Sequence, residues 1–242
     1  LAMIPSSTSD AIRVYLQENP PDVTWWLARD EIVKHDLNAF IEERRRHLPP
    51  ELRFYFHQYL TSYDTEEAAF VRTLNASCEL IREDIHAFDD VLAGLATKYR
   101  YVPFLERTHG QSAKLRSFGG RVITWKQEFG VAVSLFVSAR HWCQYSRLAG
   151  AIGNFGGNLT PELEREALRL LELEPFVGST QIMPRVLYAP LAQSLYCLAK
   201  VIGKIAHDVR LGARSGKPLW HEPFGSAQKG SSAMPHKKNT IL

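Results

Sequence analysis

Cysteine is scarce in this sequence, and its scarcity argues against two classes of protein. Only three cysteines occur among 242 residues, and they lie far apart. A disulfide-stapled fold needs an even number of paired cysteines, and a structural zinc site needs closely spaced ligands. Because all three lie in apolar helical patterns, we expect free thiols and a reducing compartment. They are Cys78, Cys143 and Cys197.

The sequence also lacks an excess of charge of one sign. It has 29 Lys and Arg against 26 Asp and Glu, a formal net charge of +3. Its one dense basic cluster, Arg44-Arg45-Arg46, is flanked by acidic residues, and we interpret it as a solvated helix end. This distribution argues against a nucleic-acid-binding surface.

Targeting and membrane signals are missing as well. The first residues do not show the basic, apolar and small-residue order of a signal peptide, and we find no apolar run long enough to span a bilayer. We therefore expect a cytoplasmic protein without a membrane partner. No cluster of ligands points to a metal, and we expect no organic cofactor.

Long helical patterns dominate what is present. No proline interrupts the chain between Pro50 and Pro103, and apolar residues recur there at steps of three and four, which predicts the apolar stripe of one long helix. The stripe is Phe70, Leu74, Cys78, Ile81, Ile85, Phe88, Leu92 and Leu95. Residues 187–209 repeat this pattern, and residues 122–142 are apolar nearly all round, which is typical of a helix in the middle of a bundle. A helix is also predicted from about Trp25 to His47, and a shorter one over residues 10–16. Another short helix is predicted to start at Thr160, where a hydroxyl residue precedes a proline and acidic residues. We find no alternation that predicts a sheet, so we expect an all-α, elongated helical bundle.

The segment Gly230–Asn239 reads Gly-Ser-Ser-Ala-Met-Pro-His-Lys-Lys-Asn. Its glycine and small residues allow movement, and Lys237 and Asn239 offer a cation and an amide suited to a carboxylate. A solvated linker with a basic tip is the structural alternative. The segment resembles the mobile loop of the fumarase/aspartase superfamily of lyases, in the form closest to its adenylosuccinate lyase branch.

Four further segments resemble motifs of that family in the same order, and each has a structural alternative. His35-Asp36 could be a surface pair, and Thr-Ser-Tyr-Asp at residues 61–64 also fits a helix N-terminus, where free N–H groups favour anions. Arg-Thr-His-Gly-Gln at residues 107–111 fits a turn, and Ser-Thr-Gln at residues 179–181 fits a helix entry.

The resemblance implies a site chemistry. Ser231 would act as the base, in its alkoxide form, and His109 would donate a proton to the leaving nitrogen. The partner would be a small succinyl nucleotide or fumarate, in a homotetramer whose sites each draw on three subunits. The residues implied in substrate binding are His35, Asp36, Thr61, Ser62, Thr108, Gln111, Gln181, Ser232, Met234, Lys237 and Asn239.

The implied reaction is removal of fumarate from adenylosuccinate or a related succinyl-carboxamide nucleotide. Two departures keep alternatives open. Lys114-Leu115-Arg116 stands where the family commonly has a proline and a threonine, which also fits a lyase for another aspartate- or succinate-derived substrate. Thr240 replaces a proline, and the family's later glutamate is absent, so we expect either a fragment or a degenerate, non-catalytic bundle protein.

We expect an N-terminal helical domain over residues 1–111, lacking its start, and a central bundle domain over residues 112–242, truncated at the loop.

Overall fold

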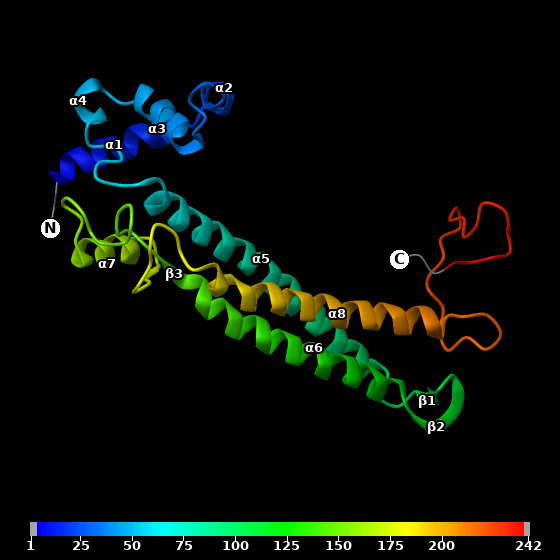
Figure 1. Cartoon of the computed structure of the whole chain (residues 1–242). Helices are drawn as coiled ribbons and strands as arrows, with labels where there is room; N and C mark the ends of the chain where they lie inside the picture. The colour runs from blue at the N-terminus through cyan, green and yellow to red at the C-terminus, as the bar shows by residue number, and fades with distance from the viewer. Residues whose placement is uncertain (1–3, 240–242) are drawn as a thin grey trace. The chain divides into compact units, whose positions relative to one another are not determined.

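A computed structural model describes residues 4–239, so the predicted departure at Thr240 lies outside the described residues. The chain forms two compact units, and α-helices dominate it (Figure 1). The first unit contains the residues up to Ser77 together with Trp142–Leu187, and the second contains Cys78–His141 together with the residues from Tyr188 onward. The boundary falls inside the longest helix, α5, which runs over Ser62–Lys98.

The first unit begins with four helices: α1 (Ser6–Glu18), α2 (Val23–Val33), α3 (Asp36–Arg46) and the single-turn α4 (Pro50–Arg53). The prediction of one helix from Trp25 to His47 is therefore wrong. Lys34 adopts a left-handed conformation with φ of 52°, and His35 is extended. Because these two conformations cannot continue a helix, the chain turns and α3 starts anew.

Only Arg46 of the basic cluster at the end of α3 is exposed to solvent, which corrects the sequence interpretation of a solvated helix end. Arg44 is buried, and its guanidinium donates to the carbonyl oxygens of Leu16 (2.9 Å) and Asn19 (2.6 Å). The buried Glu43 pairs with Arg44 at 3.4 Å and accepts from the Asp22 N–H at 3.1 Å. These bonds join the end of α1 and the start of α2 to α3.

The remainder of the first unit packs against the first turns of α5. Its helix α7 (Pro161–Leu170) begins as predicted, because the Thr160 hydroxyl accepts from the Leu163 N–H at 3.2 Å. Two-residue strands β3 (Tyr145–Ser146) and β4 (Glu174–Pro175) pair in parallel, and the 3₁₀ helices are η1 (His141–Gln144) and η2 (Arg185–Tyr188). A strand thus precedes the glycine-rich turn at residues 150–155, which the sequence did not indicate.

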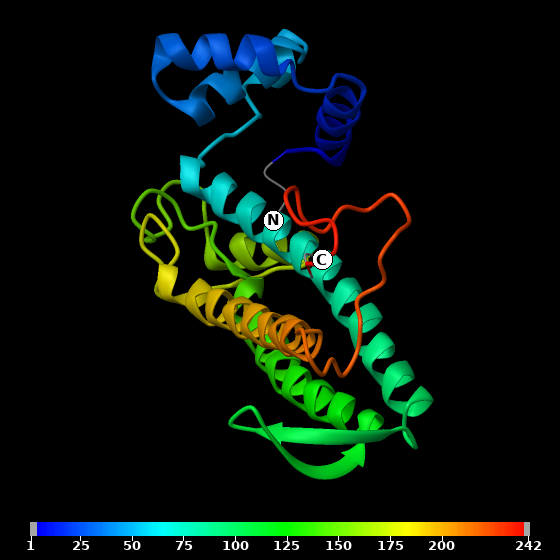
Figure 2. The same ribbon diagram turned by 90° about the vertical axis from the view of Figure 1, so that its right-hand side faces the viewer.

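Three long helices build the second unit: the latter part of α5, α6 (Phe118–Arg140) and α8 (Ala189–Gly212). Helices α6 and α8 lie side by side (Figures 1 and 2). Four buried apolar side chains of α5, Val71, Cys78, Ile85 and Leu92, recur every seven residues, as in coiled coils. The predicted apolar stripe is confirmed at Cys78, Ile85 and Leu92. Val71 was not predicted in it, and Phe70, which we placed in it, is exposed.

Polar and aromatic contacts fix the register of these helices. The Phe88 ring meets the Phe129 ring edge-on at 5.0 Å, and the Lys126 ammonium donates to the Asp89 carboxylate at 2.7 Å. Between α6 and α8, the Trp125 indole N–H donates to the Asp208 carboxylate at 2.8 Å.

A hairpin joins α5 to α6 and was missed from the sequence (Figure 2). Strand β1 (Pro103–Thr108) pairs antiparallel with β2 (Gln111–Ser117). Nearly all of β2 is exposed, so it buries no alternating apolar set that the sequence could reveal. The all-α class still holds, because the two short sheets are minor beside the helices.

The helix α6 is not enclosed within this chain, although its composition predicted a central position. Its apolar side chains Ile123, Val131, Leu135 and Val137 are exposed.

By length and composition, the segment Arg185–Gly212 could also cross a membrane, and it is the only such helix among residues 4–239. The expectation of no sufficiently long apolar run was therefore wrong, although core helices of soluble proteins meet the same criterion.

Candidate functional site

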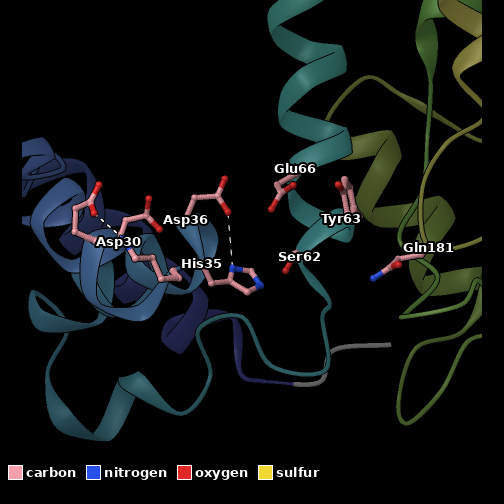
Figure 3. Close-up of a pocket in the computed structure, with 9 residues that line it drawn as sticks. Asp30, His35, Asp36, Ser62, Tyr63, Glu66 and Gln181 are labelled. Atoms are coloured by element: carbon pink, nitrogen blue, oxygen red, sulfur yellow. Dashed lines mark hydrogen bonds and ion pairs between the residues drawn. The ribbon is translucent and has the colours of Figure 1, made fainter.

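The first unit holds a cavity of about 650 Å³ against the first turn of α5. Four residues predicted from the sequence line it, and the side chains of His35, Ser62 and Gln181 point into the same space from three different elements (Figure 3). The structure therefore brings together residues separated by more than a hundred positions. The complete lining is Asp30, Glu31, Lys34, His35, Asp36, Ser62, Tyr63, Glu66 and Gln181.

The His35 ring is oriented by the start of α3. Its Nδ1 accepts from the Asn38 N–H at 3.4 Å and lies 3.7 Å from an Asp36 carboxylate oxygen. Because Nδ1 acts as an acceptor, the neutral ring carries its proton on Nε2, which leaves a donor for a ligand. The Trp26 indole N–H donates to the Asp36 carbonyl at 2.9 Å and holds this corner in place.

The N-terminus of α5 supplies the second wall of the cavity. Thr61 precedes the helix and is not among the lining residues, whereas Ser62 begins the helix and lines the cavity. Asp64, the last residue of the predicted helix N-terminus at residues 61–64, is buried and accepts from the Thr61 N–H at 3.0 Å. Its other oxygen accepts from the N–H groups of Ala149 (2.9 Å) and Gly150 (3.2 Å). The carboxylate thus ties the α5 terminus to the glycine-rich turn.

Arg147 connects this terminus to the segment that carries Gln181. Its side chain is wholly buried, lies 3.1 Å from the Asp64 carboxylate and donates to the Gln181 carbonyl at 2.7 Å. A second nitrogen donates to the Gly150 carbonyl. One buried ion pair therefore sets the spacing between two segments that line or adjoin the cavity. The sequence analysis missed Arg147, because an arginine before a glycine-rich turn carries no pattern of its own.

The glycine-rich turn approaches the Gln181 segment too closely for a side chain. Gly153 has a φ of 77°, and a Cβ there would collide with the Ser179 carbonyl oxygen. We expect Gly153→Ala to destabilise the protein by about 1–3 kcal/mol, through overpacking and a left-handed backbone. Urea unfolding measures this change. Gly156→Ala is the matched control, because a Cβ at Gly156 meets nothing within 4 Å. Equal stability of the two variants would contradict the packing described here.

Glu66 gives the cavity a dependence on pH. Burial, and then the nearby Asp36 carboxylate, raise the pKa of the Glu66 carboxyl group. A carboxyl group whose pKa is higher in the folded chain than in the unfolded chain destabilises the fold as it ionises. Stability therefore falls as pH rises from the unfolded pKa through the folded pKa. Glu66→Gln should therefore raise the Tm near neutral pH and lose this advantage in acid.

Glu162→Gln serves as the comparison, because the pKa of Glu162 is shifted in the opposite direction. Hydrogen bonds from its own backbone N–H and from Arg165 lower the pKa of Glu162, so its ionised form favours folding. This variant should lose stability near neutral pH. A Tm difference for Glu66→Gln that does not change with pH would contradict the assignment.

In the second unit, His109 lies at the tip of the β1–β2 hairpin. Thr108 and Gln111 pair across the two-residue turn, in which His109 has a φ of 53° and Gly110 a φ of 75°. Positive φ at both turn positions is the geometry that matches the twist of a hairpin. His109 is exposed at this tip, so its imidazole is accessible to a ligand.

The loop Gly230–Asn239 folds back on itself. A Cβ at Gly230 would collide with the backbone at Lys237 and Lys238, so only glycine allows this closure. Within the loop, the Ser231 Oγ accepts from the N–H groups of Ala233 (3.3 Å) and Met234 (3.1 Å). Two donors aimed at one hydroxyl oxygen favour its ionised form.

Lys237 and Asn239 line a second cavity of about 910 Å³, which lies within the second unit. Ser231, Ser232 and Met234 are described but are not among its lining residues. The structure thus places the predicted residues in separate groups: one around the first cavity, one on the hairpin, and one in this loop. Among residues 4–239, no group of three or more His, Cys, Asp or Glu side chains is placed to hold a metal ion.

Comparison with known sequences places these features in a family context. The profile of a family described as "Lyase" matches residues 26–241. A relative named adenylosuccinate lyase from Thermotoga maritima is 36% identical over 241 residues, which cover all of this chain and 55% of the relative. Another of that name, from Aquifex aeolicus, is 33% identical over 213 residues, covering 88% of this chain and 48% of the relative. The chain spans about half the length of these curated relatives.

Solved structures confirm the fold class. A fumarate lyase from Mesorhizobium sp. BNC1 superposes with a TM-score of 0.81 at 24% identity, covering 88% of this chain and 50% of that one. A 3-carboxy-cis,cis-muconate lactonizing enzyme from Pseudomonas putida gives a TM-score of 0.77 at 21% identity, with the same coverage. At these identities the likeness concerns the fold alone.

Proposed function

Since this chain belongs to the lyase family, we propose that the full-length protein eliminates fumarate from adenylosuccinate, from the related succinyl-carboxamide nucleotide of purine biosynthesis, or from both. The observation that carries the proposal is the loop Gly230–Asn239. It directs two N–H donors at the Ser231 hydroxyl oxygen and places Lys237 and Asn239 on a basic cavity. A base and a carboxylate-binding pair on one short loop are what this elimination needs.

In the proposed reaction, Ser231 removes a proton from the carbon next to a substrate carboxylate. The electrons of that C–H bond form the new C=C bond, the neighbouring C–N bond breaks, and His109 protonates the departing nitrogen. Negative charge collects on the carboxylate as the proton leaves, and stabilising that charge lowers the barrier. Lys237 and Asn239 are suited to this role.

The residues of the first cavity would bind the remainder of the substrate. Ser62 and Thr61 lie at the N-terminus of a 37-residue helix, where free N–H groups favour a carboxylate. Gln181 offers an amide, and the His35 Nε2 offers a donor. In this proposal His35, Asp36, Thr108, Gln111, Ser232 and Met234 also contact the substrate.

A homotetramer is part of the proposal, with each site drawing on three subunits. Its support is the apolar surface that the long helices leave uncovered in a single chain. Besides the exposed residues of α6, Tyr196 and Ile202 of α8 and Leu80 and Val91 of α5 are exposed. Exposed apolar surface along long helices is typical of an interface between subunits.

The substrate assignment is tested by offering adenylosuccinate, argininosuccinate and aspartate separately to the full-length protein and following fumarate by NMR. Release from adenylosuccinate alone is the expected result. Release only from another substrate would support the elimination and contradict the purine substrate. Residues 114–116 of β2, which differ from the family pattern, are consistent with such a substrate. Absence of fumarate with all three substrates, from a folded protein, would contradict the proposed elimination from adenylosuccinate.

A further inference from the structure

The cavity of about 910 Å³ extends beyond the two residues to which the proposed reaction assigns a carboxylate. It lies where the last turn of α8 and the residues after it meet the end of the described chain. Two arginines on this side, Arg210 and Arg214, have no part in the proposed reaction. The charged and titratable side chains of the lining are Arg210, Arg214, His221, His236, Lys237 and Lys238.

The charge of this lining is one-sided. It contains four Lys or Arg side chains and two histidines and no Asp or Glu, although the whole chain has 29 basic against 26 acidic residues. Among residues 4–239, none of the four permanent cations forms a salt bridge. Their polar contacts are weak, since Arg214 donates to the Gly110 carbonyl at 3.5 Å and the Lys238 ammonium lies 5.5 Å from the Phe224 ring centre.

The dipole of α8 accounts for only part of this arrangement. Cations near a helix C-terminus are stabilised, which suits Arg210 in the last turn and Arg214 just beyond it. Lys237 and Lys238 come from a segment more than twenty residues later, and the dipole does not account for their position. Like charges from two segments repel each other around one cavity, and a bound anion relieves that repulsion.

We propose that Arg210 and Arg214, with Lys238, form a binding site for a compact dianion beside Lys237 and Asn239. The planar guanidinium presents paired N–H donors that match the oxygens of a phosphate monoester or of a carboxylate. A succinyl nucleotide carries both kinds of group. The link to that substrate rests on the proposed function, whereas binding of a dianion does not.

The test is isothermal titration of the full-length protein with inorganic phosphate and, separately, with fumarate, both at constant ionic strength. Arg210→Gln and Arg214→Gln should each weaken binding by about tenfold or more, because each removes a charged hydrogen-bond donor. Lys200→Gln is the matched control, since Lys200 is an exposed cation on the same helix and does not line the cavity. Both arginines are exposed, so these variants should keep the wild-type Tm.

Binding of either dianion, weakened by both arginine substitutions and not by the control, supports the site. The titrant that binds identifies a phosphate or a dicarboxylate as its ligand. Absence of binding by both titrants, affinity that the arginine substitutions leave unchanged, or an equal loss with Lys200→Gln would overturn the proposal. Because no turnover is measured, a failure here differs from a failure to release fumarate.

Discussion

Replacing Ser231 with alanine is expected to lower fumarate release from adenylosuccinate by about 10²–10⁴-fold, the usual contribution of a general base. The physical reason lies in the loop. The Ser231 Oγ receives N–H groups from Ala233 and Met234, and these donors favour a negative oxygen that can accept a proton from carbon. Alanine removes the oxygen, and with it the acceptor of these two N–H groups. The measurement is kcat with the full-length protein.

Ser226→Ala is the matched control for this substitution. Ser226 is an exposed serine in the same segment between α8 and the end of the described chain. The change removes one hydroxyl group, as the Ser231 substitution does, and we expect wild-type turnover. If Ser231→Ala turned over at the wild-type rate, Ser231 could not be the base, and another group would have to take the proton.

Replacing Arg147 with methionine is expected to destabilise the protein by about 3–5 kcal/mol, the usual cost of removing one partner of a buried ion pair. Asp64 would keep its N–H donors from Thr61, Ala149 and Gly150 but lose its buried counter-charge. The Gln181 carbonyl would also lose its donor. Urea unfolding of the full-length protein gives the free-energy difference.

Arg165→Met is the control for lost arginine charge. Arg165 pairs with Glu162 on the surface of α7 with 58% of its side chain exposed, so its loss should cost less than about 1 kcal/mol. If the two arginine variants unfolded at the same urea concentration, the Asp64–Arg147 pair would not hold the segments together. A folded Arg147→Met protein should also bind substrate more weakly, because the Gln181 segment is released.

Local signals in the sequence predicted several elements well. The start of α5 was predicted to within a few residues, with Ser62 or Asp64 as its cap, and the start of α7 was predicted at Thr160. In both, a hydroxyl residue beside acidic side chains stabilises a helix N-terminus. The long course of α5 followed from the absence of proline and the recurrence of apolar residues. These features depend on neighbours in the chain, so the sequence reveals them directly.

Features that depend on distant contacts were not predictable in the same way. The break at Lys34 needs a left-handed residue that is not glycine, and no helix-breaking residue marks it. The β2 strand is almost wholly exposed and so lacks a buried face. Arg147 acquires its role only because the Asp64 carboxylate and the Gln181 carbonyl converge on it.

In the candidate site, too, the local motif was recognisable in the sequence, whereas the residues brought together by folding were not. The motif at residues 230–239 indicated a base and a carboxylate-binding pair, and those roles stay predictions. The sequence analysis did not indicate that Arg210 and Arg214 would lie on the cavity lined by Lys237 and Asn239, because the two segments are separate in the chain. Nor did it indicate Glu66 as part of the first cavity, since a glutamate in the first turn of a helix is ordinary.

The most direct measurement of the central claim runs the proposed elimination backwards in D₂O. The full-length protein is supplied with fumarate and adenosine monophosphate, and the adenylosuccinate formed is examined by NMR. Because the base returns a solvent-derived proton to carbon, the account predicts one deuterium on the methylene carbon of the succinyl group. Failure to form adenylosuccinate, or formation of a product without deuterium at that carbon, would contradict an elimination that begins with proton removal from carbon.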